Sequence, residues 1–513
     1  MKHFVRIATL LLALLMLMGL VVACNDGNDS DNGGESGLID DRFDVNGRLK
    51  DNLPADLNYG GEPVTVLYWS DFEIPEFEQE TITGDNVRDA IYDRNTQIEN
   101  RLNVELKWVG IPGDGGEITN FVKQVEAVYL ADEQLYDLIA VYAPTSGALA
   151  VQGYLHNLAT VEQSYMDLDA PWYPQQLVET VSFGSAYYFV SGDMSTSVLN
   201  MMHMLYINKD MFSKYQLTIP YQDVYNGTWT LDKMIELTTG LFEDLNNDNK
   251  ATDDDQYGFS TLNYILESVY ISANMRYLDE DESEILVLSP DFGSHKTVKL
   301  INKLGNWAAS GDVRIHCSHL TGEIESRALT QAIFKRGDCL ISMQHALMGA
   351  QYTNVDFELG LLPMPKYDEK QVNYYTGMGN PWSLYGIFVD FDHRDDKDAT
   401  LAMLSAVIEC WSSEGYRLTT PEVFEVNMQL KYSEGQDETN MFEYIRAGIT
   451  FDLGKIFYVD MDGMPTKVAY AIAANSSWSA SYGAYKRSLN ANVERIVDNF
   501  LEYQAKRDQQ SAT

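Results

Sequence analysis

The sequence predicts an α/β protein with two lobes. Strand-like and helix-like segments alternate between residues 64 and 141, an order that gives parallel strands covered by helices on both faces. The roughly 450 residues beyond the N-terminal region exceed what a single hydrophobic core usually supports. Apolar residues make up 45% of the chain, which is enough to fill two cores.

The first lobe can be assigned element by element. Residues 64–68 form a short β-branched and aromatic run bounded by turn residues, which predicts a strand. Apolar residues then recur at helical spacing through 86–102, which predicts a helix. The same criteria predict a strand at 104–108, a helix at 118–130 and a strand at 138–141.

The N-terminus has the order of a bacterial lipoprotein signal. Lys2 and Arg6 accompany an apolar run over 7–22, and Ala23 stands before Cys24. The run is short for a membrane span, which needs about 20 residues. We therefore expect cleavage after residue 23 and a lipid on Cys24; a leader that is simply cleaved or retained is the alternative. The protein is then extracytoplasmic and anchored to the cell membrane.

A tract rich in Asn, Asp, Gly and Ser follows the cysteine. It has nothing apolar to bury and cannot offset the entropy of ordering itself. Residues 24–59 are therefore predicted to be a flexible tether between the anchor and the folded lobes.

The charge balance excludes some classes of partner. The chain has 76 acidic and 36 basic residues, giving a formal net charge of -40. Such a charge opposes binding to nucleic acid and to anionic lipid surfaces. We expect no nucleic-acid partner, and membrane contact through the lipid anchor only.

Cysteine usage indicates neither a disulfide framework nor a zinc site. Besides the N-terminal cysteine the chain has only Cys317, Cys339 and Cys410, with no C-x-x-C pair. Cys339 lies in an apolar run and is expected to be buried and inert. Pairing of Cys317 with Cys339 is left open.

Aromatic and polar residues stand at the ends of two predicted strands. Trp69 and Asp71 follow the first strand, and Tyr142 follows the third. In open parallel sheets, ligands bind beyond the carboxyl ends of the strands. Aromatic rings stack on the C–H face of a sugar, and neighbouring polar groups bind its hydroxyls. The pattern indicates a carbohydrate site; packing of these aromatics in the core is the alternative.

Several short motifs occur in order along most of the chain, and together they resemble the extracellular solute-binding proteins of ABC transporters, family 1, the group that includes maltose-binding protein. Met204–Phe212 is close to the family pattern L-x-Y-N-K-D-L-F, and Gly153–Leu158 to G-x-L-x-D/N-L. The other matching segments are Tyr136–Ile139, Gly184–Val190, Thr228–Thr230, Ala332–Asp338 and Leu362–Pro365. The chain departs from the family at Glu414–Asp462, which is long and aromatic.

The resemblance implies a two-lobed periplasmic-binding-protein-like fold of type II, with a ligand cleft between the lobes. By this analogy the first lobe comprises residues 60–195 and 338–382, and the second 198–336 and 386–505. The chain would cross between them near 192–199, near Gly337 and near 382–385. The resemblance also implies a monomer that has no catalytic cofactor and works with ABC permease subunits.

The family's ligand-lining segments imply a set of site residues. Three tryptophans are the strongest candidates for ligand contact, because a Trp in a glycine- or serine-rich turn has few neighbours to pack against. The full set is Trp69, Asp71, Tyr142, Asn263, Tyr264, Gln344, His345, Trp382 and Trp478, of which Trp69, Trp382 and Trp478 are those three.

A second site is predicted from spacing in residues 244–255. Oxygen-bearing side chains occupy loop positions 1, 3, 5, 9 and 12, and position 7 offers its backbone carbonyl, as in calcium loops of the EF-hand type. Asn249 replaces the usual glycine at position 6, and an aspartate replaces the usual glutamate at position 12. We predict a structural calcium; a solvated acidic turn is the alternative. The proposed ligands are Asp244, Asn246, Asp248, Lys250, Thr252 and Asp255.

These patterns favour a lipid-anchored receptor, not an enzyme, that binds an oligosaccharide or other sugar outside the cell and delivers it to a permease. A surface glycoside hydrolase is the main alternative, since sugar-stacking aromatics occur there too, but no carboxylate pair stands out among 76 acidic residues. A non-sugar ligand such as a peptide also stays open.

Overall fold

The structure, a computed structural model, describes residues 42–511 except 73, 183–185, 353, 390–395 and 425–435. The predicted signal sequence and Cys24 lie outside the described residues. The chain divides into two compact units, Met1–Arg48 and Leu49–Thr513. In the first unit, residues 42–48 contain a turn in which the Gly47 N–H donates to the Asp44 carbonyl (3.0 Å). Along the described stretches, no helix is both long and apolar enough to cross a membrane.

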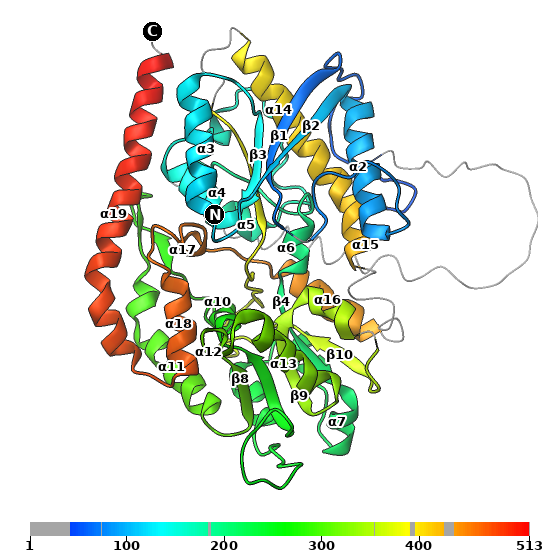
Figure 1. Ribbon diagram of the computed structural model, residues 1–513, viewed down its shortest axis with the longest axis vertical. Coiled ribbons are helices and arrows are strands. Elements are labelled where there is room, and N and C mark those ends of the chain that lie inside the picture. Colours follow the sequence, from blue (N-terminus) through cyan, green and yellow to red (C-terminus); the bar gives the residue numbers. More distant parts are fainter. Residues whose placement is uncertain are drawn as a thin grey trace, which may run out of the picture. The chain divides into compact units, whose positions relative to one another are not determined.

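The second unit contains two larger sheets, and the first has four strands in the order β11-β3-β1-β2 (Figure 1). β1 pairs in parallel with β2 and β3, and β11 joins antiparallel to β3. Helices α3 and α4 lie to one side of this sheet, and α2 and α14 to the other. The predicted strand and helix order is confirmed. The bounds are β1 (Glu62–Trp69), α2 (Asn86–Leu102), β2 (Val104–Ile111), α3 (Ile118–Ala131), β3 (Leu138–Tyr142), α4 (Ala143–Val151), α5 (Gln175–Thr180), β11 (Ser383–Ile387), α14 (Lys397–Glu414) and α15 (Thr420–Phe424).

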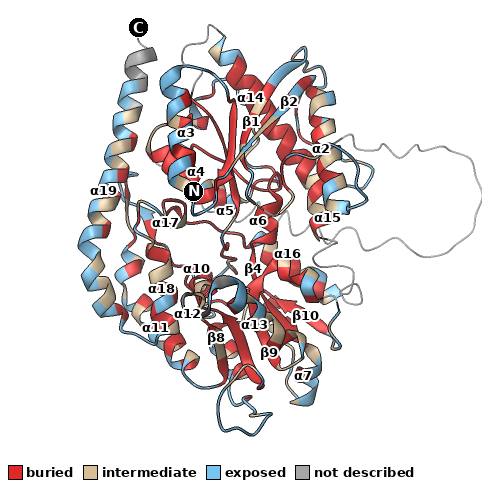
Figure 2. Ribbon diagram, viewed as in Figure 1, coloured by how far each residue is buried: buried red, intermediate tan, exposed pale blue. Residues whose placement is uncertain are grey.

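The second sheet has five strands in the order β10-β4-β9-β5-β8. β5 pairs in parallel with β8 and β9, whereas β4 runs antiparallel to both of its neighbours. Figure 2 shows these strands as buried, except for the half-buried middle of β8 (Val313–His316). The bounds are β4 (His203–Asn208), α7 (Lys209–Lys214), α8 (Tyr221–Tyr225), α9 (Leu231–Thr238), β5 (Tyr257–Leu262), α10 (Glu267–Ser272), α11 (His295–Ala308), β8 (Val313–His316), α12 (Ser318–Thr321), α13 (Glu323–Lys335), β9 (Cys339–His345), β10 (Leu359–Leu362), α16 (Gln436–Ala447) and α18 (Met464–Ala473). A separate two-stranded hairpin consists of β6 (Leu278–Glu280) and β7 (Leu286–Leu288).

One segment belongs to a different lobe from the one predicted. The prediction put 338–382 in the first lobe, but β9 and β10 from this segment pair in the second sheet. Gly337 therefore joins α13 to β9 within the second lobe. The chain passes between the sheets through residues 190–203 and 376–383, here called the crossover segments: Val190 bridges Tyr385 of β11, and Met202 bridges Met378.

The open question of a Cys317–Cys339 disulfide is settled by the sheet topology. Both residues are free thiols. Cys339 begins β9 and Cys317 follows the end of β8, so they lie at opposite ends of parallel strands, with β5 between them. Cys339 is fully buried, as predicted, and burial raises the pKa of its thiol to about 12.

The second part of the predicted tether is folded. Asp51 is buried, and its carboxylate accepts hydrogen bonds from the Leu53 N–H (3.0 Å) and from Arg101 of α2. The Tyr59 N–H donates to the Leu102 carbonyl at the end of the same helix. The apolar spacing of Leu49, Leu53 and Leu57 is the signal that could have shown this packing.

The C-terminal helix α19 (Trp478–Ser511) contacts both lobes. Near its start, Trp478 packs against Phe292 of the second lobe, with ring centroids 5.0 Å apart. Near its end, Phe500 stacks on Tyr188 of the first lobe at 5.1 Å. Figure 1 shows this helix running alongside both sheets without a break.

Glu409 of α14 is buried beside residues 165–173. Its carboxylate accepts hydrogen bonds from the Tyr173 hydroxyl (2.9 Å) and the Asp167 N–H (3.1 Å). Burial raises its pKa from 4.5 to about 7. The folded chain therefore holds this proton more tightly than the unfolded chain, so the stabilising contribution of Glu409 is fully present below pH 4.5 and is lost as the pH rises through 7.

We expect Glu409 to lower the free energy of unfolding by about 3 kcal/mol between pH 4.5 and pH 7. Urea denaturation at a series of pH values checks this. Glu409→Gln should flatten the profile in that interval, whereas Glu443→Gln, at an exposed position, should not. Identical slopes in the wild type and Glu409→Gln would contradict the assignment.

Candidate functional site

An aromatic stack lies at the carboxyl edge of the first sheet. Trp69 ends β1 and Tyr142 ends β3, and the parallel pairing of these strands brings both residues to the same edge. The Trp69 ring stacks on Phe72 (4.2 Å, 11°) and on Tyr142 (5.5 Å, 22°). Its indole N–H donates to the Ser383 hydroxyl (2.9 Å), and Trp69 is only 1% exposed.

Asp71 shapes the loop beside this stack. Its carboxylate accepts hydrogen bonds from the Gly113 N–H (2.9 and 3.0 Å) and the Asp114 N–H (3.1 Å). Because both oxygens are engaged by the backbone that follows β2, the observed role of Asp71 is to position that loop.

The second sheet presents a group of polar residues at the edge where β5 and β9 end. His345 ends β9, Asn263 and Tyr264 follow β5, and antiparallel β4 places His203 level with His345. The His203 and His345 rings lie 4.8 Å apart, and the Tyr264 ring lies 6.4 Å from that of His345. The predicted residues Asn263, Tyr264, Gln344 and His345 are thus brought together; we call them, with His203, the polar edge.

Several polar atoms of the polar edge are buried without a hydrogen-bond partner. Within the part of the chain that the structure describes, this holds for both amide atoms of Gln344, Nε2 of His345, both ring nitrogens of His203, and Nδ2 of Asn263. The Asn263 oxygen is satisfied by the Ser318 N–H and hydroxyl. Each buried unpaired polar group costs roughly 1–3 kcal/mol, so the polar edge lacks partners that a bound molecule could supply.

The two histidines are neutral at physiological pH. Burial, followed by the charges of Arg327 and Lys455, lowers the pKa of His345 to about 3. Burial, His345 and Lys455 lower the pKa of His203 as well. The nearby Lys455 is itself paired with Glu267 (2.5 Å). Each neutral imidazole offers one donor and one acceptor, so the polar edge suits an uncharged hydrogen-bonding ligand.

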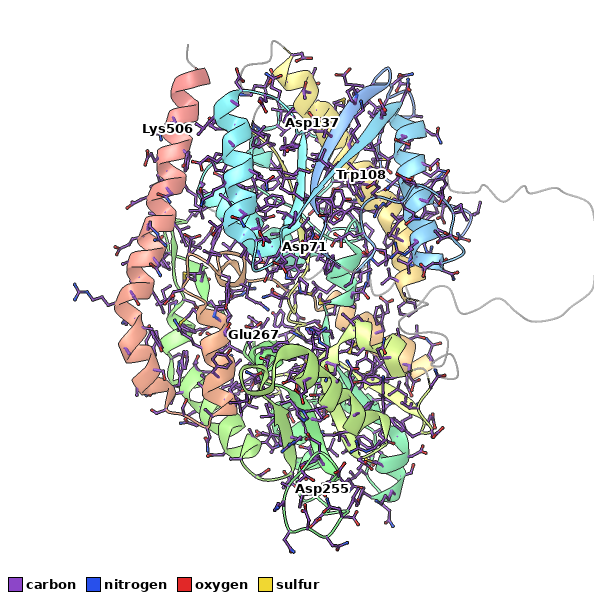
Figure 3. All side chains as sticks on the ribbon, in the orientation of Figure 1. Asp71, Trp108, Asp137, Asp255, Glu267 and Lys506 are labelled. Carbon is purple, nitrogen blue, oxygen red and sulfur yellow. The ribbon has the colours of Figure 1, made fainter. Side chains whose placement is uncertain are left out.

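The crossover segment 376–383 connects the two edges. The Gly377 carbonyl accepts from the His203 N–H (3.0 Å), and a Cβ on Gly379 would lie 2.1 Å from His345 Nε2. At the other end, the Trp382 carbonyl accepts from the Ala143 N–H (2.9 Å) beside the aromatic stack. In Figure 3, Asp71 and Glu267 lie on either side of the region between the sheets.

The expectation that Trp69, Trp382 and Trp478 lack packing neighbours is wrong for all three, since Trp69 is itself buried between the rings described above. Trp382 is 2% exposed and packs against Phe451, with ring centroids 4.8 Å apart. Trp478 is 1% exposed, donates its indole N–H to the Phe292 carbonyl (2.9 Å) and packs against the Phe292 ring. The serine-rich stretch before it precedes a helix start, not an open turn, which is why its composition misled the prediction.

His203, Glu267 and Lys455 belong to the site region but were missed by sequence reasoning. His203 stands in the run Met201–Leu205, where apolar neighbours hide a strand end. Glu267 and Lys455 are nearly two hundred residues apart and meet only in the fold. Of these three residues, only His203 could have been predicted from the sequence, because it is a lone polar side chain at the start of an apolar strand.

The predicted calcium loop has a regular conformation built from its own side chains. Asp244 accepts from the Asp248 and Asn249 N–H groups, and Asp255 from the Leu245 and Thr252 N–H groups. Asn249 has φ +60°, so it takes the left-handed conformation that position 6 requires. Across the described residues, no three His, Cys, Asp or Glu side chains gather as a metal site. Figure 3 places Asp255 at the end of the second lobe remote from the first sheet.

Comparison with solved structures shows the fold. A cyclic α-maltosyl-1,6-maltose binding protein from Arthrobacter globiformis aligns with a TM-score of 0.54 at 14% identity, covering 85% of this chain and 99% of that one. A sugar transporter from Rhizobium etli in an open conformation aligns with a TM-score of 0.53 at 12% identity (85% and 98%). The chain has the two-lobed fold of periplasmic binding proteins.

A third structure with this two-lobed binding-protein fold is an ABC substrate-binding protein from Listeria monocytogenes in complex with cycloalternan. It aligns with a TM-score of 0.50 at 13% identity, covering 85% of this chain and 98% of that one. No family model and no curated protein sequence matches the chain. In this fold, the aromatic stack and the polar edge occupy the carboxyl ends of the two sheets, where open α/β sheets bind ligands.

Proposed function

We propose that the protein is a receptor that binds an oligosaccharide between its lobes and delivers it to an ABC permease. The observation that carries this proposal is the set of buried, unpartnered polar atoms of the polar edge, next to a crossover segment that leads to an aromatic stack. Sugar hydroxyls would satisfy the polar atoms, and sugar C–H faces would stack on the rings. The three similar structures are described as a cyclic α-maltosyl-1,6-maltose binding protein, a sugar transporter and an ABC substrate-binding protein.

The mechanism we infer is closure around the ligand. The polar atoms of the polar edge have no surface open to water, so a ligand reaches them only when the lobes move apart. Bound sugar then contacts both sheet edges at once, and it favours the closed arrangement because only that arrangement makes both sets of contacts. The permease would recognise the closed form. No covalent step is required.

Two carboxylates near the site bear on the alternative of a glycoside hydrolase. Asp71 is engaged by backbone N–H groups, and Glu267 is paired with Lys455. A hydrolase needs one carboxyl group to donate a proton and another to act as base or nucleophile. Because both carboxylates already have hydrogen-bond or ion-pair partners, they favour a receptor over a hydrolase. We propose that the protein is not an enzyme.

A binding screen with product analysis tests the function. We expect linear and cyclic oligosaccharides to raise the melting temperature and to be recovered intact by chromatography. Released sugar fragments would support the hydrolase instead. Stabilisation by peptides alone would show that the ligand is a peptide and not an oligosaccharide. The proposed anchor is tested separately, since a palmitate analogue should label the wild type and not Cys24→Ser.

Trp478 provides a control for this screen. We expect Trp478→Phe to lower the free energy of unfolding by about 1–2 kcal/mol, because it removes the hydrogen bond to the Phe292 carbonyl. Its oligosaccharide affinity should equal that of the wild type, as measured by isothermal titration calorimetry. Trp69→Phe is the matched substitution at the aromatic stack and should weaken binding. A loss of affinity in Trp478→Phe would place that residue in the ligand site.

We also propose that residues 244–255 bind calcium in a structural role. The left-handed Asn249 and the inward hydrogen bonds of Asp244 and Asp255 support a loop of the required shape. Extracellular calcium would then stabilise the folded state by mass action. Calcium should raise the melting temperature and a chelator should lower it, whereas Asp244→Asn should not respond. An unchanged midpoint in the wild type would contradict the proposal.

A further inference from the structure

A cavity of about 300 Å³ lies beside the first crossover segment, and no residue of the polar edge is among its lining residues. Three parts of the chain line it: residues 169–176, residues 192–199 of the crossover segment, and residues 446–449 at and beyond the end of α16. α16 packs against β10 of the second lobe, and the 169–176 segment packs against α14 of the first through Tyr173. We call this the crossover cavity; its walls come from both lobes.

An ion pair forms the polar wall of the crossover cavity. Nη2 of Arg446 lies 2.8 Å from a carboxylate oxygen of Asp193, whose other oxygen accepts from the Thr420 hydroxyl (2.7 Å). Asp193 is buried, whereas the Arg446 side chain keeps 24% of its surface exposed. Over the described residues, Asp193 is the only acceptor paired with Arg446. The guanidinium also lies over the Tyr416 ring, with its carbon 5.8 Å from the ring centroid. A guanidinium carries five N–H donors, so Arg446 brings further donors to the lining of the cavity.

The rest of the lining is mixed in character. Gln175 and Gln176 add side-chain amides, and Asp169 adds a second carboxylate. Pro174, Leu199 and Ile449 are among the residues of an apolar wall. The two carboxylates outnumber the one guanidinium, which disfavours an anionic ligand. Charged and amide groups with donors and acceptors, set against an apolar wall, suit a molecule that has hydroxyls on one side and C–H groups on another.

We propose that the crossover cavity binds a small, uncharged, polyhydroxylated molecule of about monosaccharide size, at a site distinct from the oligosaccharide site. The volume is at the lower end of the range for small-molecule pockets, which is about 300–1,000 Å³, and this favours an occupant of about monosaccharide size. Because the walls come from both lobes, an occupant stabilises the observed arrangement of the lobes in proportion to its occupancy. This inference does not depend on what the polar edge binds.

Titration of D-glucose and of myo-inositol, followed by ligand-observed saturation-transfer NMR, tests the proposal. We expect at least one of the two to bind the wild type. Ala447→Trp should weaken that binding at least tenfold, because the indole would occupy the cavity from an exposed position. Gln176→Ala, which removes only an amide, should weaken it less. Thr439→Trp, at an exposed position of the same helix outside the cavity, should bind as the wild type does.

Variants of the polar edge separate this site from the oligosaccharide site. Gln344→Met should leave binding of the small probe unchanged even where it removes oligosaccharide binding. Loss of probe binding in Gln344→Met with full retention in Ala447→Trp would place the probe at the polar edge and overturn the proposal. Failure of both probes to bind the wild type at tens of millimolar would overturn it as well. If the wild type binds a small probe but no oligosaccharide, the result would count against the proposed receptor function and not against the crossover-cavity site.

Discussion

Replacing Gln344 by methionine is expected to stabilise the ligand-free protein and to remove oligosaccharide binding. Gln344 is fully buried, and neither atom of its amide has a hydrogen-bond partner. Methionine has a similar shape without the polar group, so the substitution removes a desolvation cost of roughly 1–3 kcal/mol for each unpaired atom. The ligand would lose hydrogen bonds at the same position, which should weaken its binding at least tenfold.

Gln371→Met is the matched control, and its expected effect on stability is the opposite of that of Gln344→Met. The Gln371 amide donates to the Ser272 and Asn373 carbonyls (both 2.8 Å) and accepts from the Tyr367 N–H (3.1 Å). Gln371→Met should therefore lower the free energy of unfolding and leave affinity unchanged. Urea denaturation and calorimetric titration of both variants measure the two effects. A destabilised Gln344→Met that still binds sugar would show that the buried amide has a structural role only.

Gly379→Ala is expected to destabilise the protein by about 2 kcal/mol or more, because it overpacks a closed contact. The added Cβ would lie 2.1 Å from His345 Nε2 and 3.0 Å from His203 Nε2. Either the crossover segment or the imidazole must move, and both belong to the proposed ligand site. Oligosaccharide affinity should fall together with stability.

A double-mutant cycle with His345→Ala tests the cause. Removal of the imidazole makes room for the methyl group, so Gly379→Ala should cost much less in the His345→Ala background. Gly483→Ala is the control: Gly483 is exposed on α19 with no atom near the added Cβ, and alanine favours a helix. Additive effects in the cycle would contradict the proposed contact between Gly379 and His345.

The part of the fold that depends on local pattern was predictable. The strand and helix order from β1 to β3 follows from periodicity, and Trp69 and Tyr142 were located at one edge because a strand end is a local feature. The sheet to which a buried strand belongs is not local. The apolar run of β9 would suit either sheet, and its pairing with β4 and β5 depends on contacts far apart in the sequence.

The candidate site shows the same division. Gln344 and His345 were located because they follow a recognisable motif, whereas Lys455 and Glu267 meet only through the packing of distant segments. Asp71 was expected at the ligand, but its carboxylate holds the loop that follows β2, a role that depends on the position of Gly113. Composition alone cannot distinguish an aspartate that binds a ligand from one that binds the backbone.

Helix α19 constrains how the lobes can separate. It is 34 residues long, roughly 50 Å at 1.5 Å per residue, and it is attached to the second lobe through Trp478 and to the first through Phe500. A stiff rod fixed to two bodies resists an increase in the distance between its attachment points but permits rotation about its own axis. Motion that keeps both ends docked is therefore a twist, and wide separation of the lobes requires the Phe500 end to detach, so the packing of Phe500 on Tyr188 and Phe457 contributes to the barrier for that separation.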